Sequence, residues 1–415
     1  MKVWILQTGE PLHIDSAGLR PMRAMNLSNA LINRGHQVTL WSSDFDHFSK
    51  QHRTGKTSFI KVSDNLEIRL ISSRGYKSHI GFSRLFDHAQ LAFNLKKELR
   101  NQAQPDVAFI GYPPIETAWV MTNWLSRGKT PSMVDVKDAW PEIYVQSLGS
   151  CLRKIALTLL WPYTLMMKSI FRKSIGINSV TEDFLAWSLN QIPRSKSNFD
   201  HVTYLTSPEK RFSEGEVADA NSWWDSLGVK NDETGNILFI GTINNVYDFD
   251  QVIHAARHSK FRYIIAGDGP NRKLMLSNQD LPDNIFLPGW INEAQAYALA
   301  SRSNAAIAPI RNRNDFAMNI TNKFFDAMRF GLPMVTSVKG IAAKVINENR
   351  VGIAFDSINI NSLLFAIDGL MADKSLRSEM SENAKNLYES KFLHEINYLG
   401  LIQHLENISE AKKSN

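Results

Sequence analysis

The sequence contains a single cysteine, Cys151, among its 415 residues. One thiol can build neither a disulfide framework nor a zinc site that needs several cysteines. We therefore exclude the small disulfide-rich class and expect a chain that tolerates a reducing compartment. The 11 histidines lack metal-ligand spacing. Asp44, Asp46 and His47 lie close together, but solvated side chains explain them better than a metal.

Long apolar runs are also missing. The start, MKVWILQTGEPLHID, holds only a short apolar run, so we expect no secretory signal. No stretch reaches the ~20 apolar residues that a membrane-spanning helix needs. A dinucleotide fingerprint, G-x-G-x-x-G, is absent after the first expected strand, which weakens a dehydrogenase interpretation. The composition, 43% hydrophobic and 21% charged, is that of a globular protein and excludes disordered and fibrous classes.

Charge is unevenly distributed along the chain. The totals are 47 Lys/Arg and 41 Asp/Glu, a formal net charge of +6. Residues 1–205 hold 25 basic and 16 acidic residues, whereas residues 206–415 hold 22 and 25. A basic first half suits an anionic partner, and charge alone does not choose between nucleic acid, an anionic membrane and a phosphorylated substrate. We place nucleic acid last, because the basic residues are scattered and no reader motif occurs.

Short apolar runs alternate with longer helical patterns. Most runs are continuously apolar, which is typical of strands buried on both faces of a parallel sheet. A polar stretch at 207–222 interrupts the alternation, which then restarts. The expected strands are 2–7, 37–43, 67–72, 106–111, 131–137, 175–180 and 201–205, then 236–241, 262–267, 284–289, 304–310, 333–337 and 353–356.

The restart predicts an α/β protein with two doubly wound, Rossmann-like domains that face each other across a cleft. We expect the first domain over 1–205 and the second over 206–389. The tail from Ser381 to Glu410 is one long helical pattern with a break near Phe392. Because it is too long to cap the second sheet alone, we expect residues 390–415 to pack back on the first domain. Loops that follow strands are the places to look for ligands.

A helix start near Thr321 gathers the densest set of polar residues in the chain. Free backbone N–H groups at a helix start, together with a lysine, make a good seat for a diphosphate. One turn later, a carboxylate can bind two ribose hydroxyls with its two oxygens. The alternative is a capped amphipathic helix with an exposed Asp. The residues concerned are Asn319, Ile320, Thr321, Asn322, Lys323 and Asp326.

Other loops in the second half can contribute to the same site. Arg311 and Arg313 add positive charge just before this helix. Gly241 and Thr242 follow the first strand of the second domain, where the backbone can approach a phosphate. AGDGP (266–270) and LPGWI (287–291) also follow strands, although turn chemistry alone accounts for them equally well.

The first half supplies acceptor-side candidates from three loops. Glu10, Arg20 and Arg23 surround the start of the first expected helix, where the dipole disfavours cations. The arginines there either hold an anion or are simply solvated. Glu116, in YPPIE, follows a strand, and its alternative role is simple helix entry. Asp138, in VDVKDAWPEIY, can orient a hydroxyl nucleophile or steady a cation-like sugar, or else cap a helix within an ion-pair cluster.

The segment 153–173 forms a separate feature. Residues 155–167 are uncharged, and Pro162 interrupts them. Basic flanks around Trp, Tyr, Leu and Met suit the surface of an anionic bilayer, here the inner face of the cell membrane. The alternative is a pair of buried helices. The flanking basic residues are Arg153, Lys154, Lys168, Arg172 and Lys173.

In their order along the chain, these segments resemble a known family. PLHID, RPMRAMNLSNALINRGHQVTLWSSDFDH, YPPIE, VDVKDAWPE, AGDGP, LPGWI and NKFFDAMRFGLPMV occur as in family-four retaining glycosyltransferases of the GT-B fold. The bacterial polysaccharide and O-antigen transferases are the most similar members. The resemblance spans nearly the whole chain, and N-K-x-x-x-[DE]-A-M-x-x-G-x-P is its most specific piece.

This resemblance implies transfer of a hexosyl or N-acetylhexosaminyl group from a nucleotide-sugar to a saccharide or polyprenyl-linked acceptor, with no metal and no other cofactor. It implies a cytoplasmic protein at the inner face of the membrane. Asp326 takes the place of a ribose-binding glutamate, and Lys323 that of a phosphate ligand. The backbone of Asn319 to Asn322 matches the diphosphate-binding segment. Gly289, Trp290 and Ile291 match a base-contacting loop, and Asp138 a catalytic-side polar residue of the first domain.

The sequence departs from the family pattern at two places. The family often has two glutamates separated by seven residues, and the first falls on Met318 here. A phosphate-binding Arg/Lys pair after the first strand of the second domain is missing, and Arg311 or Arg313 is the candidate to replace it. Two alternatives therefore stay open. One is a nucleotide-sugar epimerase of similar architecture, and the other is a non-catalytic, membrane-associated partner of a polysaccharide assembly complex.

Overall fold

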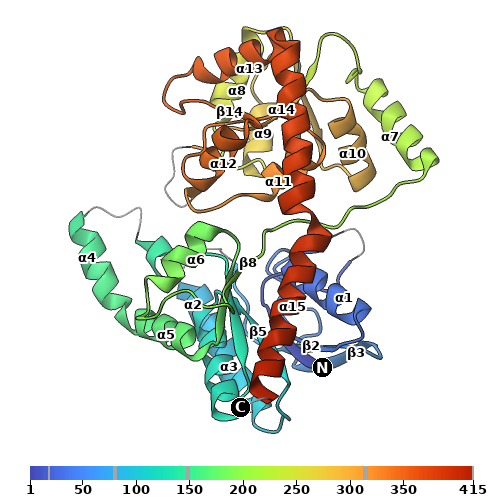
Figure 1. The fold of residues 1–415 in the computed structure, drawn as a ribbon. Helices are drawn as coiled ribbons and strands as arrows, with labels where there is room; N and C mark the ends of the chain where they lie inside the picture. Colours follow the sequence, from blue (N-terminus) through green and yellow to red (C-terminus); the bar gives the residue numbers. More distant parts are fainter. Residues whose placement is uncertain (17–18, 78–81, 146–149, 312–315, 414–415) are drawn as a thin grey trace. The chain divides into compact units, whose positions relative to one another are not determined.

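The computed structural model describes the chain except for residues 17–18, 78–81, 146–149, 312–315 and 414–415. It divides into two compact units, Met1–Pro208 with His394–Asn415, and Glu209–Leu393. Each unit has a parallel sheet with helices on both faces, the doubly wound α/β class that the alternating pattern predicts (Figure 1). The unit boundaries lie at 208/209 and 393/394, slightly later than the expected 205/206 and 389/390.

The first sheet has the strand order β3-β4-β2-β1-β5-β6-β7-β8. All neighbours pair in parallel except β3, which pairs antiparallel to β4 at the edge. Strand β3 was not among the expected strands, because its residues are mostly exposed and do not form a continuous apolar run. The strands are β1 Lys2–Leu6, β2 Gln37–Ser43, β3 Ser58–Ser63, β4 Leu66–Ile71, β5 Val107–Tyr112, β6 Ser132–Val136, β7 Gly176–Ser179 and β8 His201–Val202.

Two apolar layers cover the faces of this sheet. Helices α1 and α15 share one core with Val3 and Ile5, and α2, α3, α5 and α6 share the other with Trp4 and Leu6. Each fully buried aliphatic or aromatic side chain contributes about 1.5–3 kcal/mol. The helices are α1 Arg23–Asn33, α2 Phe82–Leu99, α3 Ile115–Arg127, α4 Ser150–Leu159, α5 Trp161–Lys173, α6 Glu182–Leu189 and α15 His394–Lys413, with a short 3-10 turn at Glu142–Tyr144.

The C-terminal tail changes units at an irregular turn. Helix α14 ends at Leu387, the chain makes a π-helical turn over Tyr388–Phe392, and α15 begins at His394. Phe392 is buried against Phe325 of the second unit, with ring centroids 5.1 Å apart. Helix α15 lies on the first unit, where it contacts α1 and β5.

The second sheet is entirely parallel, with the order β11-β10-β9-β12-β13-β14. The strands are β9 Asn236–Ile240, β10 Arg262–Ala266, β11 Ile285–Gly289, β12 Ala305–Ala308, β13 Met334–Thr336 and β14 Gly352–Ala354. The helices are α7 Glu214–Ser226, α8 Phe249–Arg257, α9 Pro270–Leu276, α10 Glu293–Ser301, α11 Asn322–Arg329, α12 Ile341–Asn349, α13 Ser362–Ala372 and α14 Lys374–Leu387.

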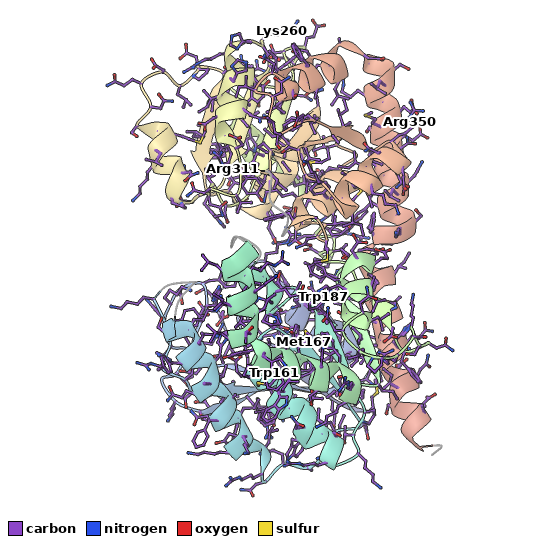
Figure 2. All side chains as sticks on the ribbon, turned by 90° about the vertical axis from the view of Figure 1, so that its left-hand side faces the viewer. Trp161, Met167, Trp187, Lys260, Arg311 and Arg350 are labelled. Carbon is purple, nitrogen blue, oxygen red and sulfur yellow. The ribbon has the colours of Figure 1, made fainter. Side chains whose placement is uncertain are left out.

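The segment 153–173 folds as two helices of different character. Helix α5 contacts α3 and buries Met167, Ile170 and Phe171, whereas its first residue, Trp161, is 61% exposed (Figure 2). Helix α4 exposes apolar side chains, with Leu159 at 75%. The buried-helix alternative therefore describes part of α5, and contact of this segment with a membrane stays a prediction. Within the described residues, no helix combines the length and the apolar character that crossing a bilayer requires.

Candidate functional site

The chain reverses its winding direction next to β9 in the second unit. From β9 it proceeds to β10 and β11 on one side, and β12, β13 and β14 then extend the sheet on the other. The loops that leave the carboxyl ends of β9 and β12 therefore diverge, and a crevice at such a switch point is where doubly wound sheets bind ligands. The loops bearing Gly241 and Arg311 leave from these two strand ends.

Three neighbouring loops are joined by backbone hydrogen bonds into one rim. The Gly241 N–H donates to the Ala266 carbonyl at 2.9 Å, and the Gly267 N–H donates to the Gly289 carbonyl at 2.7 Å. Gly267 has φ +134°, and a Cβ there would clash with the backbone carbonyl of Gly241. Gly267 of AGDGP is thus required for the packing of these loops. This agrees with the alternative in which the motif serves only the turn.

Lys323 brings a cation to this rim. Its ammonium lies 5.1 Å from the ring centroids of both Phe239 and Tyr247. A Cβ on Gly241 would clash with the Lys323 ammonium, so only glycine leaves room for it there. Aromatic faces attract a cation through their electrostatic quadrupole. The Lys323 ammonium is therefore held at the carboxyl end of β9.

The start of α11 leaves polar atoms without partners. Thr321 is the N-cap residue with extended backbone, but its side chain accepts no capping hydrogen bond. The Thr321 Oγ1 and Asn319 Oδ1 atoms are buried and have no hydrogen-bond partner among the described residues. An unsatisfied buried polar atom costs about 1–3 kcal/mol. Ile320 between them is buried, while Asn322 and Asp326, one turn apart on α11, are half-buried.

Arg311 is directed toward acidic residues at the start of α8. Its guanidinium lies 3.5 Å from the Asp248 carboxylate and 3.6 Å from that of Asp250, and its side chain is 45% exposed (Figure 2). Two carboxylates thus compete with any phosphate for Arg311. Arg313 lies outside the described residues.

The loop after β11 exposes one large ring. Trp290 is 71% exposed, and Ile291 beside it is buried. Gly289 has φ +87° and lies against the guanidinium of Arg272, whose Nη2 donates to the Leu287 carbonyl at 3.1 Å. The Arg272 Nε is buried without a hydrogen-bond partner among the described residues. The sequence analysis did not identify Arg272. Its position on α9, two residues after AGDGP, could have indicated that it belongs to this site.

In the first unit, two predicted acceptor residues form a buried network. Glu10 accepts from the Ala24 N–H at 2.8 Å and from the Lys137 ammonium. Arg23 is 2% exposed, lies 3.3 Å from the Asp135 carboxylate and donates to the Thr203 carbonyl. This network accounts for Glu10 and Arg23 without a ligand. Their assignment to acceptor binding stays a prediction, and the burial of Arg23 contradicts the alternative of a solvated side chain.

Glu116 is also buried, at the start of α3. Its Oε1 accepts from the Tyr163 hydroxyl at 3.0 Å, and its Oε2 lies 3.7 Å from the His88 Nδ1. Burial raises the pKa of Glu116, against the lowering effects of the Tyr163 hydrogen bond and Arg84. Burial, followed by the charges of Arg84 and His47, lowers the pKa of His88 to about 3. Sequence analysis missed His88, because it lies on α2, far along the chain from Glu116.

Two acceptor-side candidates remain accessible. Asp138 is half-buried and lies beyond the carboxyl end of β6. Arg20 is half-buried and donates from Nε to the Ser207 hydroxyl at 2.9 Å. Thr242, predicted to bind the donor, is exposed beyond β9. Among the described residues, no three His, Cys, Asp or Glu side chains are grouped so that they could hold a metal ion.

Comparison with protein-family models gives one match. Residues 226–387, within the second unit, match the model described as glycosyl transferases group 1. This stretch contains the rim, Lys323 and all of α11. A search of curated proteins finds no match.

Solved structures share the fold over nearly the whole chain. A sucrose-phosphate synthase from Thermosynechococcus elongatus has a TM-score of 0.71 at 15% identity, covering 99% of each chain. Anabaena Alr3699/HepE in complex with UDP has a TM-score of 0.66 at 11% identity, covering 98% of this chain and 99% of its own. WaaG, a glycosyltransferase involved in lipopolysaccharide biosynthesis, has a TM-score of 0.60 at 14% identity, with coverages of 96% and 98%. At such identities these likenesses establish the GT-B fold, and the family match supports a glycosyltransferase.

Proposed function

We propose that the chain is a retaining glycosyltransferase that moves a sugar from a nucleotide diphosphate to a saccharide or polyprenyl-linked saccharide in bacterial surface polysaccharide synthesis. The observation that carries the proposal is the start of α11, where buried oxygens of Asn319 and Thr321, without hydrogen-bond partners among the described residues, lie just before Lys323. The group 1 match over 226–387 supports it. The UDP complex of HepE and the lipopolysaccharide role of WaaG support the donor class and the pathway.

The chemistry follows from charge development in the donor. As the bond between the anomeric carbon and the phosphate oxygen breaks, its electron pair stays on the diphosphate. Lys323 and the first N–H groups of α11 stabilise that negative charge. The acceptor oxygen attacks from the face that the phosphate leaves, and the departing phosphate takes the acceptor proton. This route needs neither a protein nucleophile nor a metal.

The other proposed contacts with the donor are assigned from where each residue lies around the start of α11 and the loop after β11. Asp326 binds the ribose hydroxyls, and the Trp290 ring covers the base. In the first unit, Asp138 is the acceptor-side residue best placed to meet a saccharide, since it is half-exposed beyond a strand end. The hexosyl or N-acetylhexosaminyl identity of the sugar follows from the family resemblance.

We also propose that the protein acts at the cytoplasmic face of the membrane through residues 153–173. Leu152, Ile155 and Leu159 are exposed on α4, at a spacing that places them on one side of the helix. Arg153 and Lys154 beside them are exposed as well, and such a pattern favours anionic lipid headgroups. Sedimentation with anionic and with neutral vesicles tests this proposal, and equal binding to both would contradict the charge argument.

Lys323→Ala and Asp326→Ala test the donor site. We expect each variant to weaken UDP binding by calorimetry about 10-fold or more, because charged hydrogen bonds contribute about 1.5–3 kcal/mol. Lys344→Ala, an exposed lysine on α12, is the matched control and should bind UDP normally. Unchanged UDP affinity and turnover in both site variants would remove the assignment.

Experiments on the unaltered protein distinguish a transferase from an epimerase and from a non-catalytic partner. A panel of nucleotide-sugars screened by thermal shift identifies the donor, because a bound ligand raises the melting point. Product analysis with donor alone then separates transfer from epimerisation, since an epimerase converts donor without acceptor. A non-catalytic partner would give no heat with any nucleotide diphosphate.

A further inference from the structure

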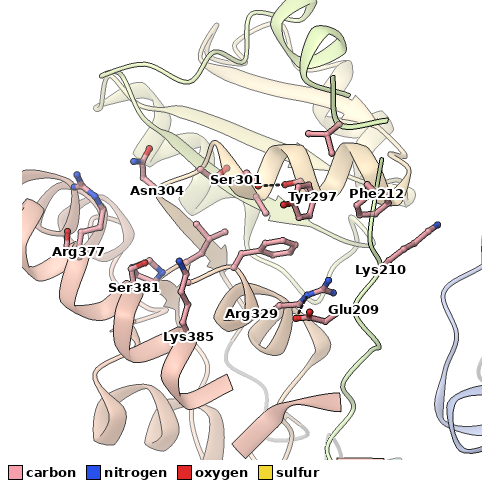
Figure 3. Close-up of a pocket in the computed structure, with 18 of the residues that line it drawn as sticks. Glu209, Lys210, Phe212, Tyr297, Ser301, Asn304, Arg329, Arg377, Ser381 and Lys385 are labelled. Carbon is pink, nitrogen blue, oxygen red and sulfur yellow. Dashed lines mark hydrogen bonds and ion pairs between the residues drawn. The ribbon is translucent and has the colours of Figure 1, made fainter. Parts of the chain in front are cut away.

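A second hollow lies in the second unit, away from the rim. It encloses about 830 Å³, within the size range of small-molecule sites. Asn304 and Pro333 line it, and each directly precedes a strand, β12 and β13 respectively. The hollow therefore opens at the amino ends of strands whose carboxyl ends face the proposed donor site. Figure 3 shows it between α10, α14 and the segment 209–212.

The walls of this hollow are strongly basic within an acidic unit. Residues 209–393 contain 20 Lys/Arg and 22 Asp/Glu, a net charge of −2. Of the charged residues that line the hollow, only Glu209 is acidic, and it lies 3.6 Å from Arg329. The basic lining residues are Lys210, Arg211, Arg329, Arg377 and Lys385.

Three of these cations, Arg211, Arg377 and Lys385, have no carboxylate partner among the described residues, whereas Lys210 pairs with Glu293 at 2.7 Å. Arg377 donates from Nη1 to the carbonyls of Leu370 and Met371, at 3.2 and 2.9 Å, so its guanidinium is positioned while its charge stays unneutralised. Lys385 is exposed on α14, and its side chain lies against Gly331. Unneutralised cations in a hollow attract an anionic group.

Aromatic rings also line the hollow, with Lys210 over the Phe212 ring and Arg329 over the Phe330 ring. Phe212 and Tyr297 have ring centroids 5.4 Å apart, and Tyr297 and Phe330 are 5.7 Å apart. Side chains that can hydrogen-bond to hydroxyl groups complete the lining. A ring face beside several hydroxyl partners suits the apolar face and the hydroxyls of a sugar. These polar residues are Ser301, Ser303, Asn304, Ser378 and Ser381.

The end of α11 also reaches this hollow, and a helix C-terminus repels anions. Its last carbonyls are satisfied, because the Gly331 and Leu332 N–H groups donate to Met328 and Ala327, both at 2.9 Å. Gly331 adopts φ +64°, the left-handed conformation that makes this cap possible. The basic lining then outweighs the remaining dipole.

We propose that this hollow binds a carbohydrate that carries a phosphate or carboxylate group. The site is separate from the proposed nucleotide site and does not depend on that assignment. The cations hold the acidic group, the serines and Asn304 hold hydroxyls, and the aromatic rings cover the sugar ring.

Calorimetry on the full chain tests the proposal. The probes are glucose 6-phosphate, glucuronate, glucose and inorganic phosphate, each with and without saturating UDP. We expect at least one anionic sugar to bind once per chain, with about 10-fold or greater preference over glucose and inorganic phosphate. The two anionic probes separate a phosphate from a carboxylate ligand. UDP should not compete.

Lys385→Glu and Phe212→Ala should each weaken that binding about 10-fold or more, whereas the control Lys344→Glu should not. Arg211→Glu provides a second charge reversal at an exposed position if Lys385→Glu fails to fold by circular dichroism. The proposal is overturned if neither anionic sugar binds, if UDP displaces it, if inorganic phosphate binds equally well, or if the charge reversal has no effect. Failure of UDP binding alone would instead affect only the donor site.

Discussion

The carboxyl edges of the two sheets use polar residues in opposite ways. In the first unit, Glu10 pairs with Lys137, and Arg23 with Asp135, beneath the surface. In the second, Lys323 lies against aromatic rings, and the oxygens of Asn319 and Thr321 have no partner among the described residues. Charged groups that pair with one another stabilise a fold, whereas buried oxygens such as those of Asn319 and Thr321 are available to a ligand. Variants should therefore affect stability at the first edge and binding at the second.

Arg23→Leu is expected to have the largest effect. Removing Arg23 leaves the buried Asp135 carboxylate with only the Lys137 ammonium, 3.7 Å away, as a counter-charge, and breaking a buried pair costs up to about 3–5 kcal/mol. Faster hydrogen exchange in the first sheet, with UDP affinity kept in the second unit, is the expected result. Arg34→Leu, which breaks an exposed pair with Glu406 at 3.2 Å, is the control and should cost under about 1 kcal/mol. Equal effects of the two variants would contradict the role of the network.

Acid should weaken the first unit through His88. Its folded pKa of about 3 lies below the ordinary value of 6.5, so the unfolded chain binds a proton that the folded one does not. The stability that neutral His88 contributes is complete above pH 6.5 and is lost as the pH falls toward 3. By pH 5 the loss is about 1–2 kcal/mol. Between pH 7 and pH 5, the urea midpoint of the His88→Gln variant should fall less than that of the unaltered protein. Equal falls in the two proteins would contradict this prediction.

Thr321→Val separates binding from stability at the second edge. The Thr321 hydroxyl makes no capping bond, so an isosteric valine should leave the melting temperature unchanged or higher. Loss of a ligand hydrogen bond should cost about 0.5–1.5 kcal/mol of UDP affinity, roughly 2- to 10-fold. A drop in stability with normal UDP affinity would show that the hydroxyl serves the fold instead.

Trp290→Ala should have the smallest effect on stability. The ring is 71% exposed, and surface changes usually stay within about 0.5 kcal/mol. UDP affinity should still fall, because base stacking contributes to binding. Comparison of uridine diphosphate with inorganic pyrophosphate gives the readout, since only the former has a base. Equal losses for both ligands would contradict contact with the base.

The sequence predicts the fold well because continuous apolar runs identify buried parallel strands directly. Strand β3 escapes this reasoning, since its outer residues are exposed and its pairing with β4 is antiparallel. On the donor side, the order of residues at one helix start placed Thr321 and Lys323 correctly at the beginning of α11. The sequence does not predict which charged side chains from distant segments contact one another. Nothing in the neighbourhood of Arg23 or Glu116 indicates Asp135 or His88, because only the fold brings those charges together.

The last residues of the chain complete the first unit. Leu401, Ile402, Leu405 and Ile408 of α15 are fully buried in the core that contains Val3 and Ile5. During synthesis, the N-terminal sheet therefore has one face covered only in part, by α1, until the entire second unit has been made. A premature stop after Leu393 would leave the second unit, Glu209–Leu393, intact. The first unit would lack the part of its core that α15 supplies.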